Sequence, residues 1–148
     1  MRELSAKYGY SDITQFLVEY VSVHPEVDHQ VDEEQRIFGK ENDDFVLDAH
    51  LGFHFVPDSI RICLICDLEE AARRILDDSG RTTETATNIK DSIDSSQKRR
   101  DAMHKNFMSL YQVDIDDHSN FDLVLDTTSL SSDEVFERAS AFIDLQRT

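Results

Sequence analysis

Residues 60–66 limit the possible folds of this chain more than any other segment. They run Ile-Arg-Ile-Cys-Leu-Ile-Cys, an apolar stretch with one polar interruption. A strand of this kind is usually covered on both faces, as in a parallel sheet. Two further apolar segments, 45–48 and 121–126, also predict strands, and helical patterns lie between the three. Strands that alternate with helices predict an α/β fold.

Helix starts are predicted by side chains that accept from the first free backbone N–H groups, or by proline in the first turn. The helix that begins at Ser11 or Asp12 has an apolar face at helical spacing, and Gly9 ends the helix before it. The final helix, 131–145, carries a Ser-x-x-Glu capping box. The predicted start residues are Ser11 or Asp12, Pro25, Asp67 and Ser131.

One domain is predicted for residues 1–148, since a chain of this length buries about 68–70% of its extended surface. No internal repeat or linker divides it. Residues 79–94 are polar with little periodicity, which is typical of a mobile surface segment. We therefore expect a lid-like segment around 79–106.

The chain is strongly acidic, with a formal net charge of −16. Such a charge argues against nucleic acid or an anionic membrane as a partner. There is no apolar run long enough to span a membrane and no signal-peptide pattern, so a cytoplasmic location is expected. Cys63 and Cys66 lack two further ligands at zinc-binding spacing, so no metal site is predicted.

The sequence contains no G-x-x-x-x-G-K-[ST] loop, the motif whose backbone amides hold nucleotide phosphates. The single Gly-Lys pair, Gly39-Lys40, is followed by Glu41. Glu34 stands where the first glycine of the motif is required.

Several short motifs nevertheless occur in the order and separation of a known family. They are Arg-Glu-Leu-Ser at 2–5, Pro-Glu-Val-Asp at 25–28, Phe-Val-Leu-Asp-Ala-His-Leu-Gly at 45–52, Tyr-Gln-Val-Asp-Ile-Asp-Asp at 111–117 and Phe-Asp-Leu-Val-Leu-Asp-Thr at 121–127. With these motifs the chain resembles the cytidylate kinase-like proteins, archaeal-type and bacterial, among the P-loop nucleoside monophosphate kinases. The last two motifs are the most specific.

This resemblance implies a three-layer α/β fold around a parallel sheet, from which the first strand and the P-loop are missing. It implies transfer of the γ-phosphoryl group of ATP, with Mg²⁺, to CMP or dCMP. Chemistry of this kind depends on positioning and on cations around the transferred group. Without the central strand, segments 45–48 and 60–66 lose a shared neighbour. We expect that the two strands close together, that another chain fills the gap by self-association through the unpaired sheet, or that the gene product begins upstream. The last of these is favoured.

The resemblance also suggests site residues. Arg2 matches an arginine that holds the phosphate of the monophosphate, and His50 stands where the family has a second arginine. Arg99 matches a catalytic arginine of the lid helix, whereas Ala102 and Asn106 replace its polar and cationic companions. Asp28 and Asp32, four residues apart on one helix face, are candidate acceptors for the amine of cytosine. Each of these side chains has an alternative interpretation as an ordinary surface group.

Two functions remain open at this stage. One is a cytidylate kinase-like protein that is inactive as this 148-residue chain. The other is a non-catalytic interaction or regulatory protein built on a kinase fold that has lost its activity. His50, Ala102 and Asn106 favour the second, whereas Arg2, Arg99 and the 114–127 region favour the first.

Overall fold

The computed structural model describes residues 2–78 and 86–147, apart from the side chains of Arg2 and Asp28. The N-terminal part is helical and consists of α1 (Arg2–Lys7), α2 (Ile13–Gln15), the π-helical turn η1 (Phe16–Tyr20) and the 3₁₀ turn η2 (Val21–Val23). Gly9 follows α1 with a φ of 83°, a conformation that suits glycine. Asp12 accepts from the backbone N–H of Gln15, as its predicted capping role requires.

The buried core lies among these N-terminal turns. Phe16 is fully buried, and Val21 has 1% of its surface exposed. Leu4, Tyr10, Tyr20 and Met103 pack around this cluster, so the core reaches α6 (Ile89–Tyr111). Thr14 and Ser95 share a hydrogen bond of 2.8 Å that also joins α2 to α6. The remaining cluster members are Ile13, Leu17 and Val27.

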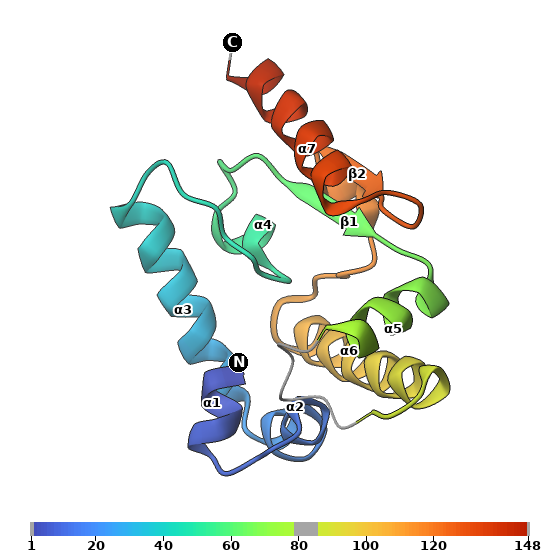
Figure 1. Cartoon of the computed structure of the whole chain (residues 1–148). Coiled ribbons are helices and arrows are strands. Elements are labelled where there is room, and N and C mark those ends of the chain that lie inside the picture. The colour runs from blue at the N-terminus through green and yellow to red at the C-terminus, as the bar shows by residue number, and fades with distance from the viewer. Residues whose placement is uncertain (1, 79–85, 148) are drawn as a thin grey trace.

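Helix α3 (Pro25–Glu41) begins at Pro25, as predicted, and runs away from the N-terminal turns toward the short helix α4 (Gly52–Phe55) (Figure 1). Gly39 lies in this helix close to Val56. A Cβ atom added at Gly39 would come within 2.6 Å of the Val56 Cγ2 atom. The glycine of the Gly39-Lys40 pair therefore allows close packing of the chain inside a helix, and it does not belong to a phosphate-binding loop.

The sheet of the described residues has two parallel strands, β1 (Ile62–Ile65) and β2 (Leu123–Asp126). Ile62 is the partner of Leu123, and Ile65 is the partner of Asp126. Arg61 and Asp122 extend this pairing, because the Arg61 backbone N–H donates to Asp122 Oδ2 over 2.8 Å and the guanidinium binds the same carboxylate. A parallel sheet with helical connections confirms the α/β class at this level.

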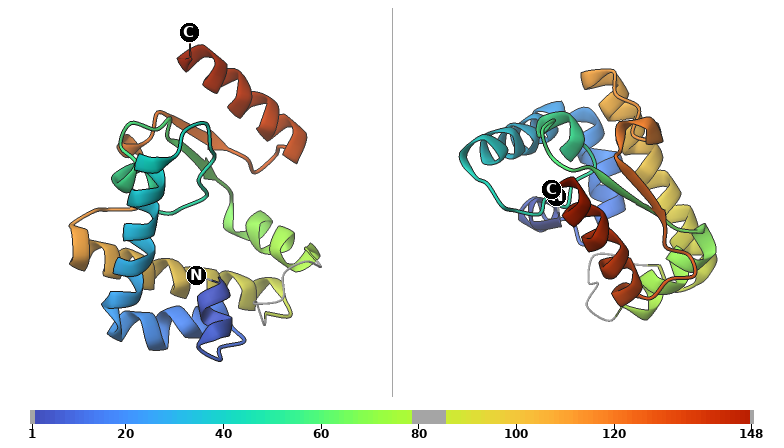
Figure 2. Two further views of the ribbon diagram at one scale, coloured as in Figure 1. Left: turned by 90° about the vertical axis from the view of Figure 1, so that its left-hand side faces the viewer. Right: turned by 90° about the horizontal axis from the view of Figure 1, so that it is seen from above.

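Helix α5 (Leu68–Asp77) follows β1 and packs on α6, and α7 (Ser132–Gln146) follows β2 and projects past the sheet (Figures 1 and 2). Asp67 accepts from the N–H groups of Glu69 and Glu70, so its predicted cap is confirmed. The capping box of Ser131 and Glu134 is confirmed as well. Among the helices that the structure describes, none combines the length and apolarity needed to cross a bilayer.

Three sequence expectations need correction. Residues 45–48 form no strand, because no described strand lies beside them to accept their hydrogen bonds. The sheet is not covered on both faces, since Leu64 is 55% exposed and Val124 is 37% exposed. The predicted polar segment 79–94 includes residues 79–85, which lie outside the described residues. From Ile89 onward it is helix α6, with Ser92 buried.

Candidate functional site

Helix α6 carries the central residues of the candidate site. Asn88 caps its start by accepting from the N–H of Asp91, and Gln112 ends it in the left-handed region with a φ of 56°. Between these ends, α6 passes the N-terminal core, with Phe107 buried. The packing of α6 on this core fixes which of its side chains face the loop that carries His50.

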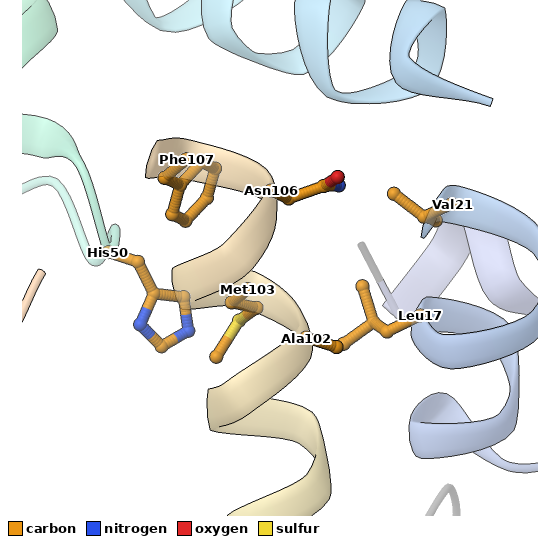
Figure 3. Close-up of a pocket in the computed structure, with 7 residues that line it drawn as sticks. All are labelled: Leu17, Val21, His50, Ala102, Met103, Asn106 and Phe107. Carbon is orange, nitrogen blue, oxygen red and sulfur yellow. The ribbon is translucent and has the colours of Figure 1, made fainter. Parts of the chain in front are cut away.

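A small cavity of about 40 Å³ lies between α6 and its neighbours. Leu17 and Val21 line it from the N-terminal turns, and His50 lines it from the loop before α4 (Figure 3). The α6 side chains on it are Ala102, Met103, Asn106 and Phe107. The structure therefore brings together His50, Ala102 and Asn106, three positions at which the sequence departs from the pattern of the family it resembles.

The surroundings of His50 favour its neutral form. The residue is exposed overall, but its ring leans toward Met103 of α6 in Figure 3. Burial of the imidazole lowers the pKa of His50, and the positive charges of Arg99 and Arg100 lower it further, whereas Asp48 raises it.

Arg99 and Arg100 supply the positive charge of the site. Arg99 is half-buried and Arg100 is exposed. Arg100 forms an ion pair with Asp116 in the loop after α6. Burial raises the pKa of the Cys63 thiol, and the charge of Arg100 opposes this shift. Arg100 thus lies between the loop, strand β1 and His50. Arg99 and Arg100 therefore bring positive charge near His50 on a chain of net charge −16, with the charge of Arg100 paired to that of Asp116.

Asp32 lies near the other end of α6, with 5% of its surface exposed. The Tyr111 hydroxyl donates to Asp32 Oδ2 over 2.7 Å, and the same hydroxyl lies 3.1 Å from His29 Nδ1. Burial raises the pKa of Asp32, while the Tyr111 hydrogen bond and the charges of His29 and His54 lower it.

The remaining candidate side chains, those of Arg2 and Asp28, lie outside the described residues. The structure therefore groups His50 with Arg99, and it places Asp32 apart from them, beneath Tyr111. Sequence reasoning missed Arg100 as a neighbour of His50, and it missed Asp48 as the opposing charge. Arg100 is adjacent to Arg99, and Asp48 lies two positions before His50, so their positions in the sequence were the available signal.

Comparison with known proteins identifies the family. Residues 3–129 match the model of the cytidylate kinase-like family. The chain belongs to this family. It is 32% identical over 132 residues to a cytidylate kinase of Pyrobaculum aerophilum, covering 88% of this chain and 67% of the relative. It is 29% identical over 144 residues to a cytidylate kinase of Thermococcus sibiricus, covering 97% and 70%.

Another relative has a different name and a much longer chain. The protein is 33% identical over 132 residues to an S-adenosylmethionine-dependent nucleotide dehydratase of Lacinutrix mariniflava. The match covers 87% of this chain but spans only a quarter of the length of the dehydratase, 25%. No solved structure matches the chain.

Proposed function

We propose that this chain forms the nucleoside monophosphate-binding part of a cytidylate kinase-like protein, with CMP or dCMP as its ligand. The observation that carries this proposal is the approach of His50 to the α6 face that bears Arg99, across 49 positions of sequence. Both residues lie at motif positions that the family resemblance links to phosphate. The names of the relatives, cytidylate kinase and nucleotide dehydratase, both concern nucleotides.

In this proposal the phosphate of the ligand lies against Arg99 and Arg100. A guanidinium offers paired N–H donors that match phosphate oxygens, and it stays charged at every working pH. His50, held neutral, donates or accepts a single hydrogen bond beside them. Arg2 remains the proposed second clamp, and Asp28 and Asp32 remain the proposed acceptors for the cytosine amine.

The residues of this chain do not fit the triphosphate of ATP or the Mg²⁺ that accompanies it. The sequence holds no glycine-rich loop with its lysine, and Gly39 is enclosed by Val56 within α3. The chain by itself is therefore not expected to transfer a phosphoryl group. In a coupled assay the 148-residue chain should form ADP no faster in the presence of CMP than in its absence. ADP formation that depends on CMP and is abolished by Arg99→Ala would contradict this expectation.

Binding tests the proposal directly. Calorimetry at low salt should show weak CMP binding that exceeds cytidine binding, because only local arginines can overcome the repulsion between phosphate and an acidic chain. Arg99→Ala should remove the difference. Arg138→Ala, an exposed arginine of α7, is the matched control and should leave it unchanged. Equal affinity for CMP and cytidine would contradict a phosphate site here.

A second candidate function, a non-catalytic interaction protein, is favoured by the composition of the cavity. Its lining includes Ala102 and Asn106 but no arginine or lysine. For such a protein we propose self-association through β1, whose pairing in the described residues is limited to β2. Sedimentation should then show a dimer that Leu64→Lys, a change at an exposed strand position, weakens. A monomer at high protein concentration would contradict self-association.

A further inference from the structure

A histidine and two aspartates converge where α6 meets the loop that follows it. They are His104, from the last third of the helix, and Asp114 and Asp116, from the loop. One ligand atom from each lies within 4.8 Å of those of the other two. None of the three belongs to the proposed nucleotide site.

We propose that His104, Asp114 and Asp116 bind a divalent transition-metal cation of the Zn²⁺ class. Imidazole nitrogen and carboxylate oxygen are the donors that zinc accepts beside thiolate, and imidazole favours it over Mg²⁺ or Ca²⁺. Three protein ligands leave the fourth position of a tetrahedral ion for water. The proposal does not depend on the nucleotide-binding function.

The imidazole supplies an observation of its own. The Nε2 atom of His104 is inaccessible to solvent, although the side chain as a whole is 38% exposed. It faces Asp114 Oδ1 at 3.2 Å. A cation that binds between these two atoms would replace the proton that Nε2 carries toward the carboxylate.

The spacing requires a modest closure of the site. At zinc bond lengths of about 2.0–2.2 Å, neighbouring ligand atoms of a tetrahedral site lie about 3.4 Å apart. Asp114 and Asp116 side chains are 51% and 44% exposed, so they can rotate toward His104 without disturbing the core. Asp114 Oδ1 also accepts from the Asp116 backbone N–H over 2.8 Å, which holds the two aspartates near each other.

Arg100 competes with the cation. Its guanidinium pairs with Asp116, and a bound metal must displace it from that carboxylate. The positive charge of Arg100 therefore opposes binding of a metal cation. Removal of the Arg100 charge should therefore strengthen metal binding, whereas removal of a ligand residue should weaken it.

The test is titration of the 148-residue chain with ZnCl₂ alone at pH 7, followed by calorimetry and by ¹H–¹⁵N NMR of the histidine rings. We expect saturable binding at one site per chain, with the His104 ring signals shifted most. His104→Ala and Asp114→Asn should each weaken binding about tenfold or more, as loss of zinc-site residues does. Arg100→Gln should strengthen it.

His118→Ala is the matched control, because His118 is an exposed histidine of the same loop region and not a member of the proposed site. It should leave zinc affinity unchanged. Far-UV circular dichroism of each variant separates loss of a ligand from loss of the fold. Heat that does not saturate, or an affinity equal in the wild type, His104→Ala and Asp114→Asn, would overturn the proposal.

Discussion

The hydroxyl of Tyr111 donates a 2.7 Å hydrogen bond to the carboxylate of Asp32, and this bond joins the last residue of α6 to the middle of α3. The carboxylate is almost entirely buried, with 5% of its surface exposed. Aromatic contacts of Tyr111 with His29, His54 and Phe55 surround the bond. A single tyrosine thus connects α3, α4 and α6.

Tyr111→Phe should lower the free energy of unfolding by about 1–3 kcal/mol, because it leaves a buried carboxylate without its donor. Urea denaturation followed by circular dichroism measures the change. Tyr10→Phe is the matched control, since the Tyr10 ring packs on Phe16 and its hydroxyl is not part of such a bond. Equal losses in the two variants would show that ring packing, and not the Asp32 bond, is responsible.

Asp32→Asn should change how the free energy of unfolding depends on pH. Burial raises the native pKa of Asp32 above the ordinary value of 3.8, so the native state binds this proton more tightly than the unfolded state. The resulting stabilisation is complete below 3.8 and is lost as pH rises through the native pKa. Asparagine does not ionise, so Asp32→Asn should gain free energy of unfolding relative to the wild type as pH rises from 3.8 through the native pKa of Asp32.

Urea unfolding of the wild type and Asp32→Asn at pH values from about 4 to 7 measures this difference, and other titrating groups cancel in it. Placing both proteins in a Tyr111→Phe background should extend the interval to higher pH, because the tyrosine hydrogen bond lowers the pKa of Asp32. A difference that stays constant with pH would contradict the prediction.

His50→Arg should strengthen CMP binding about tenfold relative to cytidine. Arginine is always charged and binds phosphate through paired donors, whereas the lowered pKa of His50 favours a neutral ring at pH 7. Hydrogen bonds to charged groups contribute about 1.5 kcal/mol or more, which corresponds to roughly that factor. Calorimetry provides the measurement. His118→Arg adds the same charge elsewhere, and an equal gain there would indicate a general electrostatic effect.

Arg74→Met should destabilise the protein by about 2 kcal/mol. Arg74 Nη2 donates to the carbonyl oxygens of Thr127, Thr128 and Leu130 at 3.0, 3.1 and 3.2 Å, and so connects α5 to the turn after β2. Methionine keeps the aliphatic stem and removes these donors. Within the part of the chain that the structure describes, the neighbouring Arg73 makes surface ion pairs with Glu70 and Asp77, worth about 0–1 kcal/mol. Arg73→Met is therefore the control in urea denaturation, and an equal loss in both variants would contradict the prediction.

The parts of the fold that the sequence predicted are those decided by nearby residues. The Asp67 and Ser131 caps were predictable because each side chain binds backbone groups no more than three positions away. Residues 45–48 were mispredicted because a strand needs a neighbour, and apolarity alone does not supply one. The prediction of a sheet covered on both faces was wrong for the same reason, because the segments that cover a sheet come from distant parts of the chain.

The candidate site shows the same division. The resemblance singled out His50 and Arg99 as site positions, but the approach of His50 to α6 became visible only in the structure. The bond between Tyr111 and Asp32 joins residues 79 positions apart, and no local pattern indicates it. His104 was not singled out by its sequence context, because its partners Asp114 and Asp116 reach it only through the turn after α6.

Each pair in the two-stranded sheet joins residues 61 positions apart, as Arg61 and Asp122 do beside it. Closing a loop of that length costs on the order of 3 to 4 kcal/mol of chain entropy, which must be met before any strand pairing stabilises the product. The helical turns around Phe16 need no such closure. During synthesis, they can form while β2 is still being made. The sheet is therefore expected to appear late in refolding, and its formation should set the slower phase.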